Sequence, residues 1–370
     1  MTPHEGCVAL NLVPGVGFVR YSALLEHFGS AGAVFSASKS ELMEVPGVGE
    51  QLACRIASFD VKGELERELS AADKGGVRIF ALTDPEYPNA LRELYDPPIC
   101  LYWRGRVPDA EMPTCAIVGS RRLSSYGSRM TAAIASDAAA AGFGIVSGLA
   151  LGADAVAHSA AVDAGTPTLG IIGGGMMNFY PRSNLELARR MVDSGGAVLS
   201  EFPLNFPVHR TNFPRRNRIV AALSRAVIVT EAGLESGALI TAKLALELGR
   251  EVFAVPGHAD NPQAQGCHKL IKEGAGLVEN FGDVLEALGF GRAEAPELPG
   301  LAGDDAPAGA SPEEQTVLKV IAAENEAGLD RLKEATGFDT GTLLSALMKL
   351  ELKFLVERGD DQLYRRTASR

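Results

Sequence analysis

The chain has 370 residues, more than one compact domain usually holds, so we expect two or three domains. Hydrophobic residues make up 46% and charged residues 22%, as in soluble globular proteins, and no apolar run reaches the ~18 residues of a membrane span. The five cysteines form no C-x-x-C pair, and the N-terminus lacks the basic start of a signal peptide. We therefore expect a cytoplasmic protein, without a membrane partner, a disulfide framework or a zinc ribbon.

The net charge of −11 is unevenly distributed along the chain. Residues 1–112 carry 10 Lys and Arg against 16 Asp and Glu, and residues 291–370 carry 10 against 15, whereas residues 113–290 carry 15 of each. Within this neutral middle, no acidic residue lies between Glu201 and Glu231, but five arginines do: Arg210, Arg215, Arg216, Arg218 and Arg225. Such a run is either a solvated face or a surface for an anion, so the overall acidity does not exclude a nucleic-acid partner.

Residues 1–75 contain the phrase Val-Pro-Gly-Val-Gly twice, at 13–17 and 45–49, each followed by an amphipathic helical stretch. This pattern is typical of helix-hairpin-helix motifs, whose glycines let backbone amides approach a phosphate. Two tight turns between helices, or a surface that docks a protein, explain the repeat equally well. We predict a helical SAM-like domain here and leave open whether it contacts DNA or protein.

Residues 80–290 alternate short apolar runs with helical stretches. Strands are predicted near 115–119, 144–147, 168–172, 197–199, 226–230 and 251–255, with a helix over 126–141. This alternation predicts an α/β fold: an extended Rossmann-like, doubly wound parallel sheet. Its ligand is expected at the carboxyl ends of the strands.

The C-terminal part begins with a stretch rich in Ala, Pro, Gly and Asp, which predicts a linker at 291–310. Residues 311–370 then predict a winged-helix domain, with helices at 312–323, 330–336 and 340–352 and a wing of two strands at 354–357 and 362–366, joined by a turn at 359–361. The third helix offers a DNA groove little beyond Thr342, Ser345 and Lys349, so we favour a protein contact over sequence-specific DNA reading.

Four segments of the middle domain place glycine or small residues where a strand ends and a helix begins: 119–122, 147–154, 173–175 and 235–241. Such junctions present unpaired N–H groups at the positive end of a helix, which suits a phosphate, although packing alone also explains glycines there. Neither G-x-G-x-x-G nor G-x-x-x-x-G-K-[ST] occurs. The pattern therefore points to a phosphate-bearing ligand other than a dinucleotide or a hydrolysed NTP.

The middle domain also carries a series of motifs in a fixed order: Ile117–Arg121, Val146–Asp154 with His158, Tyr180-Pro181 with Asn184, Ser200-Glu201, Phe213–Arg218, Glu231-Ala232, Ser236-Gly237, Thr241–Lys243 and Val255–Gly257. This order resembles that of the DNA-processing proteins of the DprA family, also called Smf, over about residues 80–290. The helical and winged-helix flanks look like those of longer family members. The resemblance implies a homodimer that binds single-stranded DNA, protects incoming DNA and loads RecA onto it during natural transformation and recombination, with the single-strand-binding protein as a further candidate partner.

The candidate DNA-binding residues lie at the glycine junctions and in the arginine-rich segment, which we expect to be a turn. A guanidinium after a strand end can grip a phosphate through two hydrogen bonds, and the resemblance favours Arg121 for this role. Asn217 is expected to bond either a base edge or a backbone group, and Phe213 or Tyr180 to stack on a base. The full set is Gly119, Ser120, Arg121, Arg122, Ser147, Gly148, Arg182, Phe213, Arg215, Arg216, Asn217, Arg218, Ser236, Gly237 and Lys243.

Catalytic groups are not expected. Asp154 and His158 lie four residues apart on one predicted helix, where such a pair is more often structural, and His209, His258 and His268 lack the spacing of metal ligands. A related superfamily hydrolyses nucleoside monophosphates with a P-G-G-x-G-T-x-x-E motif, but residues 235–241 offer no glutamate at the matching position. We predict a DNA-binding protein without catalytic residues, metal or cofactor. The alternatives are a nucleotide-hydrolysing enzyme of that superfamily and a winged-helix regulator that binds DNA.

Overall fold

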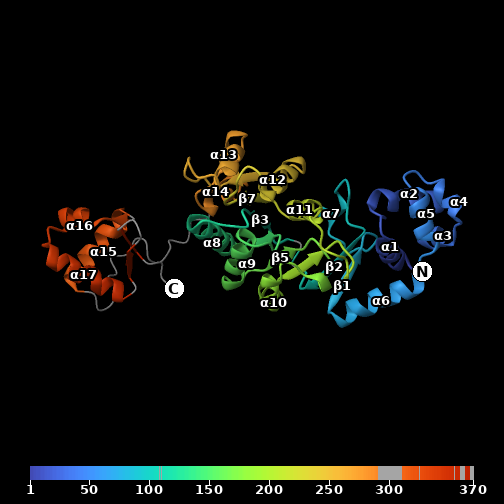
Figure 1. Ribbon diagram of the computed structural model, residues 1–370, viewed down its shortest axis with the longest axis horizontal. Helices are drawn as coiled ribbons and strands as arrows, with labels where there is room; N and C mark the ends of the chain where they lie inside the picture. The colour runs from blue at the N-terminus through green and yellow to red at the C-terminus, as the bar shows by residue number, and fades with distance from the viewer. Residues whose placement is uncertain are drawn as a thin grey trace. The chain divides into compact units, whose positions relative to one another are not determined.

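The computed structural model describes residues 1–107, 109, 111–290, 311–324, 326–353, 355–358 and 363–366 (Figure 1). The chain divides into two compact units, Met1–Ala293 and Glu294–Arg370. The predicted linker at 291–310 and the predicted turn at 359–361 lie outside the described residues. Among the described helices, none has both the length and the apolar character needed to span a membrane.

The first unit is built on a nine-stranded sheet with the order β1-β2-β6-β5-β4-β3-β7-β8-β9. Seven of these strands run parallel: β3 (Thr114–Val118), β4 (Gly144–Ser147), β5 (Thr168–Ile171), β6 (Ala197–Ser200), β7 (Ala226–Val229), β8 (Glu251–Ala254) and β9 (Gly276–Leu277). The predicted parallel, doubly wound sheet is therefore confirmed. Two further strands, β1 (Val77–Ala81) and β2 (Cys100–Gly105), extend one edge in antiparallel register. These two and the short β9 are the strands of this sheet that the sequence reasoning missed.

Helices cover both faces of the sheet, because its central strands are apolar on both sides. One face packs against α11 (Asn212–Ala222), α12 (Gly237–Glu247) and α13 (Gln265–Lys272). The other packs against α8 (Ser125–Ala140), α9 (Ala153–Asp163), α10 (Leu185–Asp193) and α14 (Phe281–Ala287). The chain runs from β3 outward through β4 and β5 to β6, and then returns to β7 on the other side of β3. The strand order therefore reverses between β3 and β7.

The arginine-rich segment, expected as a turn, is the helix α11. Pro214 lies in its first turn, where the missing N–H is no loss because the first amides of a helix have no partner within it. Apolar residues at the C-terminal half of α11, including Ile219 and Val220, are buried against the sheet. The prediction of a turn was wrong: residues 212–222 are helical, because burial of these apolar side chains stabilises the helix against the sheet.

The N-terminal segment forms helices α1 (Pro3–Leu12), α2 (Phe18–Phe28), α3 (Ala31–Ser36), α4 (Lys39–Met43), α5 (Glu50–Ala57) and α6 (Val61–Lys74). The two glycine hairpins lie side by side, since Arg20 donates from Nη1 to the Gly15 carbonyl at 2.6 Å and from Nε to the Gly47 carbonyl at 2.9 Å. The repeat thus forms a paired helical-hairpin unit, as the sequence predicted.

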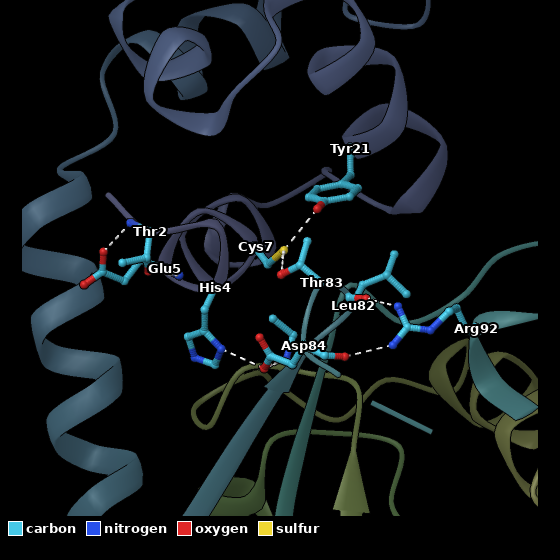
Figure 2. Close-up of polar contacts among 10 residues, drawn as sticks. Thr2, His4, Glu5, Cys7, Tyr21, Leu82, Thr83, Asp84 and Arg92 are labelled. Carbon is cyan, nitrogen blue, oxygen red and sulfur yellow. Dashed lines mark hydrogen bonds and ion pairs between the residues drawn. The ribbon is translucent and has the colours of Figure 1, made fainter. Parts of the chain in front are cut away.

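These helices pack directly on the antiparallel edge of the sheet. Their apolar side chains share one hydrophobic cluster with Ala81 on β1 and Tyr102 on β2. Figure 2 shows α1 attached to the loop after β1, with Nδ1 of His4 2.8 Å from Oδ2 of Asp84 and Sγ of Cys7 3.6 Å from Oγ1 of Thr83. The domain boundary predicted near residue 80 falls inside β1, so a fragment that begins there would lose part of this strand.

The second unit contains α15 (Pro312–Glu324), α16 (Leu329–Thr336) and α17 (Thr340–Leu352) with a three-stranded sheet of order β10-β12-β11: Glu326–Ala327, Tyr364–Arg366 and Val356–Arg358. The winged-helix prediction is confirmed, and β10 is a strand that the sequence reasoning missed. On α17, the third helix, Leu344 and Met348 are exposed. The preference for a protein contact at this helix stays a prediction.

Candidate nucleic-acid interface

A cleft of about 480 Å³ lies where the strand order reverses, at the carboxyl ends of β3 and β7. It is lined by the residues that follow β3, by the start of α12 and by the first turns of α11. Doubly wound sheets bind their ligands at such a switch point, because the loops from the two neighbouring strands diverge there and leave an opening.

Arg121 and two aromatic rings form one side of this cleft. The guanidinium of the exposed Arg121 lies 5.1 Å from the centre of the Phe213 ring, and the rings of Phe213 and Tyr180 are 6.2 Å apart. A second, shallow hollow between Arg121, Tyr180 and Phe213 adjoins the cleft. A cation placed over a ring brings together the two groups that single strands use, a positive charge for phosphate and a flat surface for a base.

Carboxylates of the protein already accept from amides at two of the strand–helix junctions that were predicted to hold phosphate. Oδ2 of Asp154 accepts hydrogen bonds from the amides of Gly148 (3.0 Å) and Ala150 (3.2 Å). Likewise, Oε1 of Glu231 accepts from the amide of Ser124, the N-cap of α8, at 3.0 Å. The start of α12 differs, because Ser236 and Gly237 line the cleft and its cap is the neutral Ser236 hydroxyl, which accepts from the amide of Ala238 at 3.3 Å. The positive end of α12 is therefore the helix start best placed for an anion.

Arg216 lies at the floor of the cleft, with only 4% of its surface exposed. Its guanidinium donates to the carbonyl oxygens of Gly148 and Ile171. Gly148 directly follows β4, and Ile171 is the last residue of the neighbouring strand β5. Burial lowers the pKa of Arg216 to about 10, and Asp154 opposes this shift. A Cβ atom on Gly148 would lie 2.5 Å from Nη1 of Arg216, so the close approach of this arginine requires glycine there.

Asn217 also lies in the cleft, where it links helices α11 and α12. Its side-chain amide donates to the Gly237 carbonyl at 3.4 Å and its Oδ1 accepts from Nε of Arg216 at 3.2 Å. These contacts are within the protein, so the role expected for Asn217 toward DNA stays a prediction.

The structure gathers part of the predicted site and leaves part outside. Lining the cleft are Gly119, Ser120, Arg121, Gly148, Phe213, Arg216, Asn217, Ser236 and Gly237. Not among the cleft-lining residues are Arg122, Ser147, Arg182, Arg215, Arg218 and Lys243.

Four of the six residues outside the cleft contact other parts of the protein, and the other two are exposed on the surface. Oγ of Ser147 donates to the Ile117 carbonyl at 2.6 Å, and Arg215 and Arg218 both bind Oε2 of the buried Glu201, at 2.9 and 2.8 Å. Lys243 lies near Glu247 on the exposed side of α12. Arg122 and Arg182 are exposed.

Gln263, Glu235 and Thr241 also line the cleft but were not in the predicted set, although segment 235–241 was one of the predicted junctions. Gln263 lies in the loop between β8 and α13, and its Oε1 is 3.3 Å from Oγ of Ser120, a residue 143 positions earlier in the chain. No local pattern in the sequence marks such a residue, because only the folded sheet brings the two loops together.

The predicted structural pair of Asp154 and His158 is not formed. Asp154 turns to the amides of its own loop, whereas Nδ1 of His158 lies 2.7 Å from Oγ1 of Thr168. The Thr168 hydroxyl donates its single proton to the Ile145 carbonyl, so Nδ1 carries the histidine proton. Nε2 is buried without a hydrogen-bond partner, and burial lowers the pKa of His158 to about 3. Within the described part of the chain, no cluster of His, Cys, Asp or Glu could hold a metal.

His158 should make the protein less stable in mild acid. Because its pKa is about 3 when folded and about 6.5 when unfolded, the unfolded chain takes up the proton first as the pH falls. The free energy of unfolding should drop by about 1.4 kcal/mol per pH unit below 6.5, or about 2 kcal/mol at pH 5. Urea denaturation at pH 7 and pH 5 measures this loss. His158→Asn keeps a donor for Thr168 but does not titrate, and an equal loss in this variant would assign the effect to other groups.

Comparison with known proteins decides the family. A family model described as DNA recombination-mediator protein A matches residues 78–289, and a model of the DprA winged helix domain matches residues 302–362. The chain belongs to the DprA/Smf family of DNA-processing proteins. A third model, the SAM-like helix-hairpin-helix tandem, matches residues 9–59 and agrees with the paired glycine hairpins.

Individual DprA/Smf relatives support this placement. Protein Smf of Synechocystis is 34% identical, over 97% of this chain and 98% of the relative. The X-ray structure of DprA from Streptococcus pneumoniae superposes with a TM-score of 0.65 at 33% identity, covering 77% of this chain and 98% of that one. DprA from Helicobacter pylori, whose structure is described as showing its single-stranded DNA binding mode, gives a TM-score of 0.50 at 30% identity over 57% of this chain and 95% of its own.

Proposed function

We propose that this chain binds single-stranded DNA in the cleft at the strand-order switch. The observation that carries the proposal is the exposed guanidinium of Arg121 over the Phe213 ring, beside the open start of α12. Arg121 and the amides of α12 supply positive potential for the phosphates, and Phe213 with Tyr180 supplies a surface for a base. The similar H. pylori protein, described as binding single-stranded DNA, supports the same ligand here.

The geometry favours a single strand over a duplex. A base can reach the Phe213 ring only if it leaves its neighbours, and in a duplex this costs both stacking and pairing. In a single strand the bases are free to turn toward an aromatic side chain. Fluorescence anisotropy with a labelled oligonucleotide, alone and annealed to its complement, tests the proposal. We expect clearly tighter binding of the single strand, and equal binding of both forms would contradict it.

A fragment that ends at residue 290 should retain most of the affinity for single strands. Every residue that lines the cleft lies between Val118 and Gln263, in the first compact unit. The fragment keeps residues 1–79, because the N-terminal helices share a hydrophobic cluster with β1 and β2. Anisotropy of the fragment and the full chain is the measurement. A folded fragment that fails to bind would move the site to the winged-helix unit.

We also propose that the protein acts as a homodimer that loads RecA onto single strands during natural transformation, without catalysis of its own. The match to the recombination-mediator family model supports this role. A strand coated by a single-strand-binding protein delays RecA, because a filament must first displace the coat. A dimer that holds two stretches of bare backbone lowers this barrier by binding energy alone.

The test is the lag before RecA hydrolyses ATP on coated strands, measured with and without this protein. We expect a shorter lag and no ATP turnover by this protein alone. An unchanged lag at saturating protein would leave a DNA-binding protein that is not a mediator. Sedimentation of the free protein tests the dimer, and a monomer at assay concentrations would contradict that part of the proposal.

Nucleotide hydrolysis is the second candidate, because the carboxylate-bearing residues Glu235 and Asp154 line the cleft. Two amides hold Asp154, which leaves Glu235 as the group available for proton transfer. Incubation with nucleoside monophosphates and detection of released base decides the question. Release that disappears in Glu235→Gln would establish the enzyme, and no release agrees with the binding function.

A further inference from the structure

Helix α6 of the N-terminal segment contacts the loop between β6 and α11 through a buried carboxylate. Glu68 is only 7% exposed, and its Oε1 accepts a hydrogen bond from the backbone amide of Leu204 at 2.8 Å. The Leu204 side chain belongs to the same hydrophobic cluster as the N-terminal helices. Leu204 is therefore held by the N-terminal helices through both its backbone and its side chain, although it lies between β6 and α11.

The segment that follows Leu204 is joined to the glycine-rich loop after β5. The Leu204 carbonyl accepts from the amide of Met177 at 2.9 Å, and the Phe206 carbonyl accepts from the amide of Gly175 at 3.0 Å. Asn212, the first residue of α11, donates from its side chain to the Gly173 carbonyl at 2.9 Å. These hydrogen bonds, together with one from the Asn178 side chain to the Asn205 carbonyl at 2.7 Å, connect two loops that are about 30 residues apart, so a shift of one loop moves the other.

Both loops support the aromatic rings of the cleft. Phe213 follows Asn212 directly, and a Cβ atom on Gly173 would lie 3.0 Å from its ring, so the ring rests against the glycine backbone. Tyr180 follows the same glycine-rich loop and lies 6.2 Å from Phe213. We call Phe213 and Tyr180 the aromatic platform. A chain of direct contacts runs from Glu68 through Leu204 and the glycine-rich loop to this platform.

We propose that Glu68 is a positioning residue, through which the N-terminal helices hold the aromatic platform in place for a DNA base. The residues that line the cleft do not include Glu68 or any other residue of the N-terminal helices, so the effect passes through the two loops. Loss of the carboxylate leaves the buried amide of Leu204 without an acceptor, and the loop must move for water to reach it. Arg121 and α12 make none of the hydrogen bonds in this chain, so we expect them to keep their attraction for the phosphates. The inference rests on the proposed single-strand binding and predicts that Glu68 affects only its base-dependent part.

The experiment compares the full-length protein with Glu68→Leu, which has no acceptor, and Glu68→Gln, whose amide oxygen can still accept from Leu204. Glu66→Leu, on the exposed side of the same helix, is the matched control. Affinity is measured for a single strand and for an abasic strand of the same length. We expect Glu68→Leu to lose about tenfold in affinity for the normal strand, the contribution of roughly one stacked base, and to bind the abasic strand as the wild type does. Glu68→Gln and Glu66→Leu should match the wild type on both strands.

An equal loss on both strands, or an unchanged affinity for the normal strand in a folded Glu68→Leu protein, would overturn the inference. If Glu68→Leu does not fold, Glu68→Asp, with a side chain one methylene shorter, replaces it. Hydrogen exchange supplies a readout without DNA: the variant should lose protection at the amide of Leu204 and at residues 212–216 of α11. A loss confined to Leu204 would also overturn it. If the wild-type protein does not bind single strands, the proposed function is refuted. If the wild type binds but the loss of protection in Glu68→Leu is confined to Leu204, only the role of Glu68 is refuted.

Discussion

Arg121→Ala should weaken single-strand binding by one to two orders of magnitude at moderate salt. Its guanidinium is exposed in the cleft over the Phe213 ring, where it can bond a phosphate directly. A hydrogen bond to a charged group is worth about 1.5–3 kcal/mol, which corresponds to this range. Binding releases fewer counterions when one phosphate contact is missing. The slope of log affinity against log salt should therefore also become shallower by roughly 0.7. Anisotropy titrations at several salt concentrations give both values.

The matched control is Arg122→Ala. Arg122 is the next residue, carries the same charge and is exposed, but it does not line the cleft. It should lose only the small, general attraction of one positive charge. Equal losses in the two variants would mean that DNA responds to net charge and not to the geometry of the cleft. An unchanged affinity in folded Arg121→Ala would remove this residue from the site.

Arg216→Met should destabilise the fold by about 3–5 kcal/mol, the usual cost of removing one of two opposite charges that are buried near each other. The substitution leaves the carbonyls of Gly148 and Ile171 without their donor and the buried Asp154 without its counter-charge. Burial already raises the pKa of Asp154, and Arg216 is the charge that opposes this rise most, so the carboxyl would take up a proton more readily in the variant. Urea denaturation at neutral pH measures the loss.

Arg215→Met is the comparison for Arg216, since it removes the neighbouring arginine from the same helix. Arg215 is half-exposed, and its partner Glu201 keeps the ion pair with Arg218. We expect a loss of stability below about 1 kcal/mol. DNA binding by Arg216→Met should fall only as far as the folded fraction falls. A variant with wild-type stability and no affinity would instead make Arg216 a direct DNA ligand.

The charges around the cleft explain how an acidic protein could bind an anion. The chain as a whole carries −11, and carboxylates of Asp154 and Glu231 accept from amides at two strand–helix junctions near the cleft. What attracts a phosphate is local: Arg121 at the side of the cleft and the open start of α12. Local potential of this kind is screened by salt, which is why the proposed binding should depend strongly on ionic strength.

The parallel sheet and the location of the cleft could be predicted from the sequence. Buried parallel strands consist of short apolar runs, and residues such as Ile117 and Val227 stand in runs of this kind between helical stretches. Once the alternation of strands and helices is known, the switch-point rule places a ligand at the strand ends. The strands β1 and β2 escaped prediction for two reasons. Prolines and acidic residues interrupt the segment between them, and the two strands pair with each other in antiparallel register at the edge of the sheet.

The sequence by itself determined the fold class, the order of the helical, Rossmann-like and winged-helix segments, and a family resemblance strong enough to indicate a DNA ligand. Only the tertiary structure decided which of the predicted residues face that ligand. Arg121 follows strand β3 and Arg216 lies within α11, and the sequence proposed both as DNA ligands, yet one is exposed in the cleft and the other is buried beneath it. The reason is physical: exposure and hydrogen-bond partners depend on contacts such as Arg216 with Ile171, 45 positions apart, which form when the sheet folds and leave no mark in the local sequence.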